Sequence, residues 1–326
     1  MNVLQLMRQA RFEIDTVRAS GSYSGLWTDE ELLSSCNIAM DRTARLLRIA
    51  GSELLTKHMR STDGATDFIT EVYSPATGLR ITANQSDYTL PPDFVSIAAL
   101  RPTVAVSGFE NVRFRPSAYH DPNWTEMKTI PTADLPNADN SDMVYAYVVQ
   151  GRTLRIAPTP QDTFDVELAY HFRPARMRYY STGTVQRTSG AVGVNGSGTA
   201  WLTYGLRELA DLMVGVTATT GVTLDAHYPE ILRFDTDTTL TLSRSATVTD
   251  AVGQSYTIAM KPALPEEHHT WLAQVVAANL LRKVDADLSA KMVVELGNQL
   301  LEQVLPEVTM RQMQESLVAT CFEVWA

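Results

Sequence analysis

The chain has 326 residues, of which 44% are hydrophobic and 20% are charged, a composition typical of a folded protein. Its 37 Asp and Glu residues against 27 Lys and Arg residues give a formal net charge of −10. This acidic balance excludes a protein whose whole surface binds nucleic acid, because phosphate neutralisation needs clustered Lys and Arg. The length suggests about two domains.

The two cysteines, Cys36 and Cys321, are too few and too far apart for a disulfide framework. Cys36 lies in a helical apolar pattern, so we expect it to be a buried free thiol. The first residues lack the basic leader and apolar run of a secretory signal. No stretch approaches the roughly 18 apolar residues that a membrane span needs, so we expect no membrane segment.

The first 66 residues show helical periodicity. A stripe at helical spacing predicts a first helix and comprises Val3, Leu6, Met7, Ala10, Ile14 and Val17. Thr28 and Glu31 form the pattern of a capping box, which predicts a second helix that continues to about Leu54.

From about Asp67 to Pro174 the period changes toward two, which indicates strands. The expected strands are 68–73, 78–82, 87–90, 143–149, 153–157 and 164–170. Residues 150–152 form the expected turn of a meander. Residues 115–142 are rich in Pro, Asn and Asp and are typical of a long surface loop, which in a compact protein is usually functional or mobile.

Residues 181–260 are dominated by Thr, Val and Gly and predict a small β-barrel or sandwich. The expected strands are 183–187, 212–218, 230–234, 238–242 and 255–259. Residues 207–211 are interpreted either as part of this strand region or as a short helical turn.

Helical periodicity returns after Pro265, with apolar positions from Trp271 to Leu281 and a further helix from about Leu288 to Leu305. The pattern as a whole predicts an α+β fold. Its helical core comes from both chain ends (1–66 and 261–305), and 181–260 is inserted as a separate β domain. The expected boundaries are 1–180, 181–260 and 261–326.

Motifs for catalysis, cofactors and metals are sought and not found, so the chain is expected not to be an enzyme. His268 and His269 lack the spacing of metal ligands and are interpreted as polar residues of a helix's first turn. The Gly-rich stretch 195–199 lacks the ending of a phosphate loop and is interpreted as a turn leading to Trp201. Asp235-Thr236-Asp237 resembles a short acidic metal motif, but a turn between strands is the favoured interpretation.

Two segments are candidates for binding. In 170–180 three arginines alternate with aromatic residues, which suits DNA contact by Arg173, Arg176 and Arg178, although a strand end joined to a linker is the favoured interpretation. The alternating apolar end 320–326 either packs on its own fold or docks on a partner through Phe322, Val324 and Trp325.

Several patterns resemble the head-to-tail connector (adaptor) proteins of tailed bacteriophages. Trp27–Leu33 is similar to their opening helix, and Asp87–Phe94 looks like their strand and Pro-containing turn. Leu154–Pro160 and Leu168–Pro174 look like their hairpin. In 181–260, three segments resemble a β module recurrent in phage structural proteins: 196–201, 237–242 and 255–258. A departure from that module is that 207–211 replaces its usual turn.

The resemblance implies a virion structural protein that forms a twelve-fold ring beneath the portal and joins the capsid vertex to the tail. The implied partners are the portal protein, a tail nozzle or tail tube protein, further copies of the chain, and double-stranded DNA that passes through the lumen without specific binding. An acidic wall suits such a channel because it repels phosphates. The implied location is the head–tail interface of the virion, after synthesis in the host cytoplasm.

Two other classes stay open. A carbohydrate-binding or hydrolytic tail-associated protein would act through the β insert, with Trp201, Asp235 and Asp237 as its site. A nucleic-acid-binding module would use the three arginines of 170–180.

Overall fold

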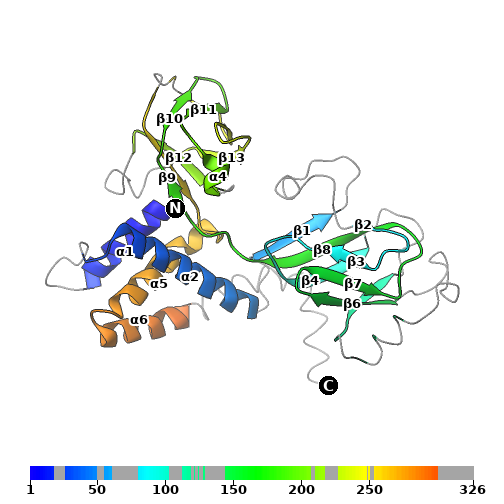
Figure 1. Cartoon of the computed structure of the whole chain (residues 1–326). Helices are drawn as coiled ribbons and strands as arrows, with labels where there is room; N and C mark the ends of the chain where they lie inside the picture. The colour runs from blue at the N-terminus through cyan, green and yellow to red at the C-terminus, as the bar shows by residue number, and fades with distance from the viewer. Residues whose placement is uncertain are drawn as a thin grey trace. The chain divides into compact units, whose positions relative to one another are not determined.

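The structure is a computed structural model (Figure 1). It describes residues 1–17, 26–49, 55–60, 80–102, 112–118, 121, 124, 128, 144–206, 210–216, 227–247, 249 and 253–299. The chain forms two compact units. The first joins Met1–Leu54 to Pro174–Ala326, and the second is Leu55–Arg173. Helices and several sheets are both present, as expected for an α+β fold.

The described residues of the first unit form four longer helices, which lie together in Figure 1. They are α1 (Val3–Val17), α2 (Asp29–Ile49), α5 (His269–Leu281) and α6 (Ala286–Gln299). A 3-10 turn, η6 (Glu266–His268), precedes α5. Helices α1, α2 and α6 all pack against α5, and seven of the last ten residues of α5 are buried.

The predicted stripe of α1 is confirmed, since its members from Val3 to Ile14 are fully buried. The side chain of Val17 is not described. Cys36 is confirmed as a buried free thiol, and burial raises its pKa to about 12. The second helix is described only to Ile49, where it was expected to reach Leu54.

The capping box of α2 is confirmed. The Thr28 hydroxyl accepts a hydrogen bond from the Glu31 amide at 3.2 Å, and the Thr28 amide donates to Glu31 Oε2 at 3.1 Å. Two N–H groups without helical partners are therefore satisfied.

Replacing Thr28 with alanine is expected to lower the free energy of unfolding by about 1 kcal/mol, because the Glu31 amide loses its acceptor. Urea denaturation measures this change. Ser34→Ala is the matched control, since Ser34 is exposed on α2 and lies inside the helix. An equal loss in both variants would contradict a capping role.

The first unit also holds a seven-stranded sheet in the order β10-β11-β14-β13-β12-β15-β9. Its strands are β9 (Tyr179–Tyr180), β10 (Thr184–Arg187), β11 (Gly193–Ser197), β12 (Ala210–Val214), β13 (Glu230–Phe234), β14 (Thr239–Leu242) and β15 (Tyr256–Met260). All neighbouring strands in this order pair antiparallel. The two strands at the ends of this order, β9 and β10, follow each other in the chain. Val185 of β10 also bridges Gln254, just before β15.

The five strands expected within 181–260 are present, with shifted bounds, and the expected strand at 212–218 begins at Ala210. Ala210 and Asp211 therefore lie in a strand, not in a helical turn, and 207–209 lie outside the described residues. Strand β11 was missed because the Gly-rich stretch was interpreted as a turn. Gly196 is required there, since a Cβ atom would lie 2.8 Å from the Trp201 ring. Trp201 itself starts a short helix, α4 (Trp201–Tyr204).

The described residues of the second unit form two four-stranded sheets that share one core. One consists of β1 (Thr56–Arg60), β2 (Arg80–Ile81), β4 (Phe94–Pro102) and the central β8 (Phe164–Phe172). The other has the order β3-β7-β6-β5, with β3 (Asp87–Thr89), β7 (Thr153–Ala157), β6 (Val144–Gln150) and β5 (Arg113–Pro116). Strand β5 runs parallel to β6, and the other pairs are antiparallel.

Three strands of this unit, β1, β4 and β5, correct the sequence-based expectations. Thr56–Arg60 was assigned to a helical core over 1–66 but forms strand β1, because it pairs along its length with β8. Strand β4 was not expected at all. Its two register irregularities, between Phe94 and Ser96 and between Ile97 and Ala99, interrupt the alternation on which strand prediction relies.

Strands β2, β3, β6, β7 and β8 follow the sequence pattern, and Gly151 turns between β6 and β7 with φ of 60°. The expected strand 68–73 lies outside the described residues. Most of the expected loop 115–142 is also outside them, although Arg113–Pro116 is a strand and Trp124 is buried. The last expected helix is found as α6, described to Gln299.

Candidate functional site

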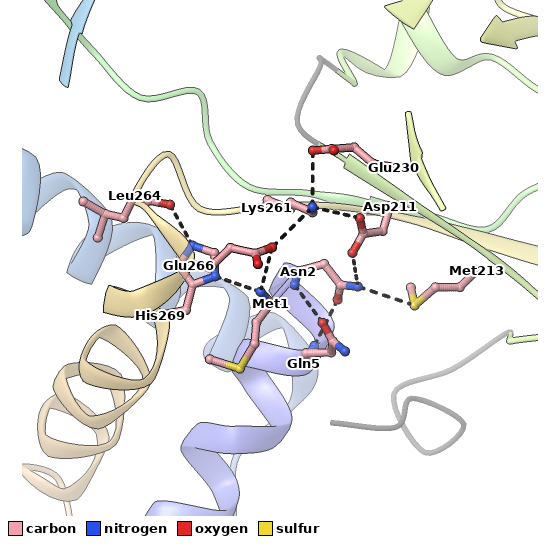
Figure 2. Close-up of polar contacts among 10 residues, drawn as sticks. All are labelled: Met1, Asn2, Gln5, Asp211, Met213, Glu230, Lys261, Leu264, Glu266 and His269. Carbon is pink, nitrogen blue, oxygen red and sulfur yellow. Dashed lines mark hydrogen bonds and ion pairs between the residues drawn. The ribbon is translucent and has the colours of Figure 1, made fainter. Parts of the chain in front are cut away.

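A largely buried polar cluster in the first unit joins the helices to the seven-stranded sheet (Figure 2). Its residues come from the start of α1, from β12, from the chain after β15, from η6, whose Glu266 is exposed, and from the start of α5. We call this cluster the polar junction: Asn2, Gln5, Asp211, Lys261, Glu266 and His269.

Asn2 links α1 to the sheet. Its side-chain oxygen accepts from the Gln5 amide at 3.1 Å, and its own amide donates to Gln5 Oε1 at 3.0 Å, a reciprocal cap of α1. The Asn2 Nδ2 group donates to Asp211 Oδ2 at 3.1 Å and lies 3.7 Å from the Met213 sulfur. Because Asn2 is fully buried, this hydrogen bond places α1 on β12.

Lys261 is the central cation of the junction. Its ammonium lies 3.3 Å from Asp211 Oδ1, 3.3 Å from Glu230 and 3.5 Å from Glu266. Burial lowers the pKa of Lys261, but the carboxylates of Asp211 and Glu230 outweigh it and leave the pKa above its ordinary value. Burial raises the pKa of Asp211, which Lys261 and Asn2 partly offset. The junction therefore holds a charge pair largely removed from water.

His269 lies at the helical end of the junction and is 1% exposed. Its Nε2–H donates to the Leu264 carbonyl at 2.8 Å, and its Nδ1 accepts from the Met1 amino group at 2.8 Å. Burial, and then the charge of that amino group, lower the pKa of His269 to about 4. The expected place in a helix's first turn is correct, but both His268 and His269 are buried.

The arginines of 170–180 are all exposed. Arg173 belongs to the second unit, whereas Arg176 and Arg178 belong to the first. Asn37 of α2 holds the backbone between the latter two, since it accepts from the Met177 amide at 2.7 Å and donates to the Met177 carbonyl at 3.1 Å. Arg178 donates to the Tyr204 carbonyl and stacks on the Tyr204 ring.

The aromatic residues of this segment are used by the fold. Tyr170 is fully buried and donates to Asp93 at 3.2 Å, and Tyr180 is buried against Tyr204 and Tyr256. Such rings are not open to stack on bases. The three guanidinium groups therefore remain as candidates for phosphate contact, but of the four aromatic residues only Phe172 and Tyr179 are partly exposed.

The residues of the candidate carbohydrate site, Trp201, Asp235 and Asp237, also make contacts within the fold. Trp201 is fully buried, and its indole N–H donates to the Tyr256 hydroxyl at 2.8 Å. Asp237 accepts from the amide and hydroxyl of Thr203, which lowers its pKa. Asp235 pairs with Arg233 at 2.7 Å. The two aspartates therefore hold turns, as the favoured interpretation predicted.

Among the residues that the structure describes, no group of three His, Cys, Asp or Glu side chains could hold a metal ion. No helix in that part of the chain is long and apolar enough to cross a membrane. The docking candidates Phe322, Val324 and Trp325 lie outside the described residues.

Sequence reasoning missed the polar junction. Its first and last members, Asn2 and His269, are 267 positions apart, and each was polar in a segment without a motif. Asp211 was considered only within the segment 207–211, and Lys261 was not singled out. A lone charged residue inside an apolar β pattern, as in 210–214, is the one signal that could have pointed to it.

The buried polar groups described above hold one element on another, as in a structural protein. Comparison with known families agrees with this class. Residues 1–191, more than half of the chain, match the family model described as SU10 adaptor protein. The chain belongs to this family, which confirms the resemblance to phage head-to-tail adaptors. No curated protein matches the chain significantly.

The match covers α1, α2, the whole second unit and strands β9 and β10. The remaining strands of the seven-stranded sheet, α5 and α6 lie beyond it. Membership of the family makes the chain an adaptor among the structural proteins of a phage particle, where it contacts other head and tail proteins.

Proposed function

We propose that the chain forms a homo-oligomeric ring, a dodecamer, beneath the portal, where it joins the capsid vertex to the tail and continues the DNA channel. Family membership carries this proposal. The role needs no chemical step, so we infer that the protein is not an enzyme. It would be made in the host cytoplasm and then incorporated into the virion.

The polar junction supports a load-transmitting role. A ring subunit that links two larger assemblies has to keep its parts at a fixed geometry. The junction ties α1, α5 and the seven-stranded sheet together through buried hydrogen bonds and a buried charge pair. Such contacts specify one arrangement of the layers when every partner is present.

We further propose that the seven-stranded sheet closes into a small barrel. Strands β9 and β10 are consecutive in the chain and stand at the two ends of the sheet order, and Val185 bridges Gln254. This barrel is the candidate module for a tail nozzle or tail tube protein, because most of it lies outside the family match.

Native mass measurement of the purified protein, with and without portal protein, tests the ring. We expect a complex of about twelve copies bound to portal. A monomer that fails to join portal at any concentration would overturn the proposal.

The DNA of the channel should not be bound specifically, and Arg173, Arg176 and Arg178 are its candidate contacts. Replacing all three with glutamine should leave ring assembly intact.

The C-terminal segment is proposed to dock on portal or on a neighbouring subunit through Phe322, Val324 and Trp325. Deleting 320–326 should leave a folded protein, as judged by circular dichroism, that no longer joins the assembly. Assembly of the truncated chain at the wild-type level would show that this segment is not the docking element.

A further inference from the structure

The helical part of the first unit exposes apolar side chains on two different helices. Helix α5 is central, and α2 and α6 pack on different sides of it. Arg42 of α2 donates to Asn279 of α5 at 2.9 Å. On α6, Ser289 donates to the Ala278 carbonyl, one position earlier on α5, at 2.7 Å. Among the described residues, α2 and α6 both pack on α5 and not closely on each other, so they leave separate outer faces.

The outer face of α2 is apolar at its ends and basic between them. Ile38 and Leu46 are 47% and 49% exposed. They stand eight positions apart, with Arg42 midway, and so fall on one side of the helix. We call this the α2 face: Ile38, Asp41, Arg42, Arg45 and Leu46, all exposed, with Arg42 also donating to Asn279 of α5 in the same chain. It carries two arginines against one aspartate, so its formal charge is +1 although the chain is acidic overall.

The outer face of α6 has the opposite character. Val293 and Val294 are 52% and 65% exposed, and Val294 is the most exposed of the large apolar residues described. The buried side of α6, with Ser289 and Leu296, points to α5 instead. We call this the α6 face: Asp287, Ala290, Lys291, Val293, Val294 and Glu295, all exposed. Two carboxylates against one lysine give it a formal charge of −1.

The α2 face and the α6 face are complementary in charge, whereas two copies of the same face are not. Contact between α2 faces of two copies would oppose arginines, and contact between α6 faces would oppose carboxylates. Contact between one α2 face and one α6 face buries valines against isoleucine and leucine and brings opposite charges together. Within one chain each face belongs to a different helix packed on α5, so the partner that carries the complementary face is another copy.

We propose that the α2 face of each subunit binds the α6 face of a second copy of this chain, head to tail. Such a contact is heterologous, leaves one free face at each end, and closes into a ring when the rotation between copies permits. The inference rests on the proposed ring and names the surfaces that build it.

Two charged variants test the contact. The α2-face variant is Ile38→Glu with Leu46→Glu, and the α6-face variant is Val293→Glu with Val294→Glu. The matched control is Val192→Glu with Leu232→Glu, two exposed apolar positions in the β region of the same unit, 45% and 37% exposed. Thermal unfolding first confirms that each variant folds. Native mass spectrometry then compares assembly with wild type, with and without portal protein.

We expect each face variant alone to stay monomeric while the control assembles like wild type. An equimolar mixture of the two face variants should form a 1:1 dimer and no ring, because one intact pair of faces remains. Wild-type assembly by either face variant, or a mixture that stays monomeric, would overturn the inference but leave the ring standing. A wild-type chain that stays monomeric even with portal would overturn the ring itself.

A cross-link keeps the test decisive if a charged variant fails to fold. Leu46→Cys and Val294→Cys are made in separate chains that also carry Cys321→Ser, and Cys36 is buried. A short bismaleimide should cross-link the mixture of the two chains into a dimer, and neither chain alone. Cross-linking of either chain with itself at the level of the mixture would contradict the head-to-tail contact.

Discussion

Replacing Lys261 with methionine is expected to lower the free energy of unfolding by about 3 kcal/mol. Methionine keeps most of the apolar stem but leaves the buried Asp211 carboxylate without its cation. The expected value lies at the lower end for broken buried ion pairs, because Glu230 and Glu266 are partly in water and lose little. Urea denaturation at pH 7 measures the change.

The control is the double variant Lys261→Met with Asp211→Asn. Asparagine has no charge to bury and its carbonyl oxygen can still accept from Asn2. The double variant should therefore recover most of the lost stability. If it is no more stable than Lys261→Met alone, the loss comes from contacts other than the buried pair.

Stability is expected to fall by about 3 kcal/mol through His269 as the pH drops from about 6.5 to about 4. The folded state keeps His269 neutral down to about pH 4, whereas the unfolded chain takes up a proton near its ordinary pKa of 6.5. Between these values the unfolded state binds more protons, so stability decreases as pH falls. Above pH 6.5 this contribution is fully present.

Asp211 changes the stability in the opposite direction. Burial raises its pKa in the folded state, so the folded state takes up the proton first and gains stability as the pH falls. The effect of His269 is therefore isolated by comparison with His269→Gln, which can still donate to Leu264 and accept from Met1. The free energy of unfolding is measured by denaturation at successive pH values for both proteins. The wild-type value minus the variant value should change between about pH 6.5 and about pH 4 with the slope expected for about one proton. Parallel curves for the two proteins would mean that His269 is not held neutral.

The positions of the charged residues explain why the sequence pattern did not predict the polar junction. Asp211 and Lys261 are fifty positions apart, and what brings them together is the pairing of β12 with β15. Neither residue has a spacing that signals its partner. The favoured interpretation of Asp237 as a turn residue was correct, since it lies between β13 and β14, but its contact with Thr203, 34 positions away, was not predicted.

The secondary-structure elements that depend on contacts between residues close in the chain could be predicted from the amino-acid sequence. The stripe of α1 and the capping box of α2 depend on contacts within a few residues, and the strands of the hairpin around Gly151 depend on alternation and a turn. The composition and order of motifs also sufficed for the α+β class and for the adaptor family.

The features that depend on contacts between residues far apart in the chain could be seen only in the folded structure. Thr56–Arg60 became a strand because β8 supplied its hydrogen-bond partners, although it follows a helical pattern. Trp201 became a core residue because Gly196 left room for its ring. The net charge of −10 excluded a general grip on nucleic acid, but only the fold showed that Arg42 and Arg45 form a basic face. Long-range pairing and burial, which no local period encodes, account for each of these outcomes.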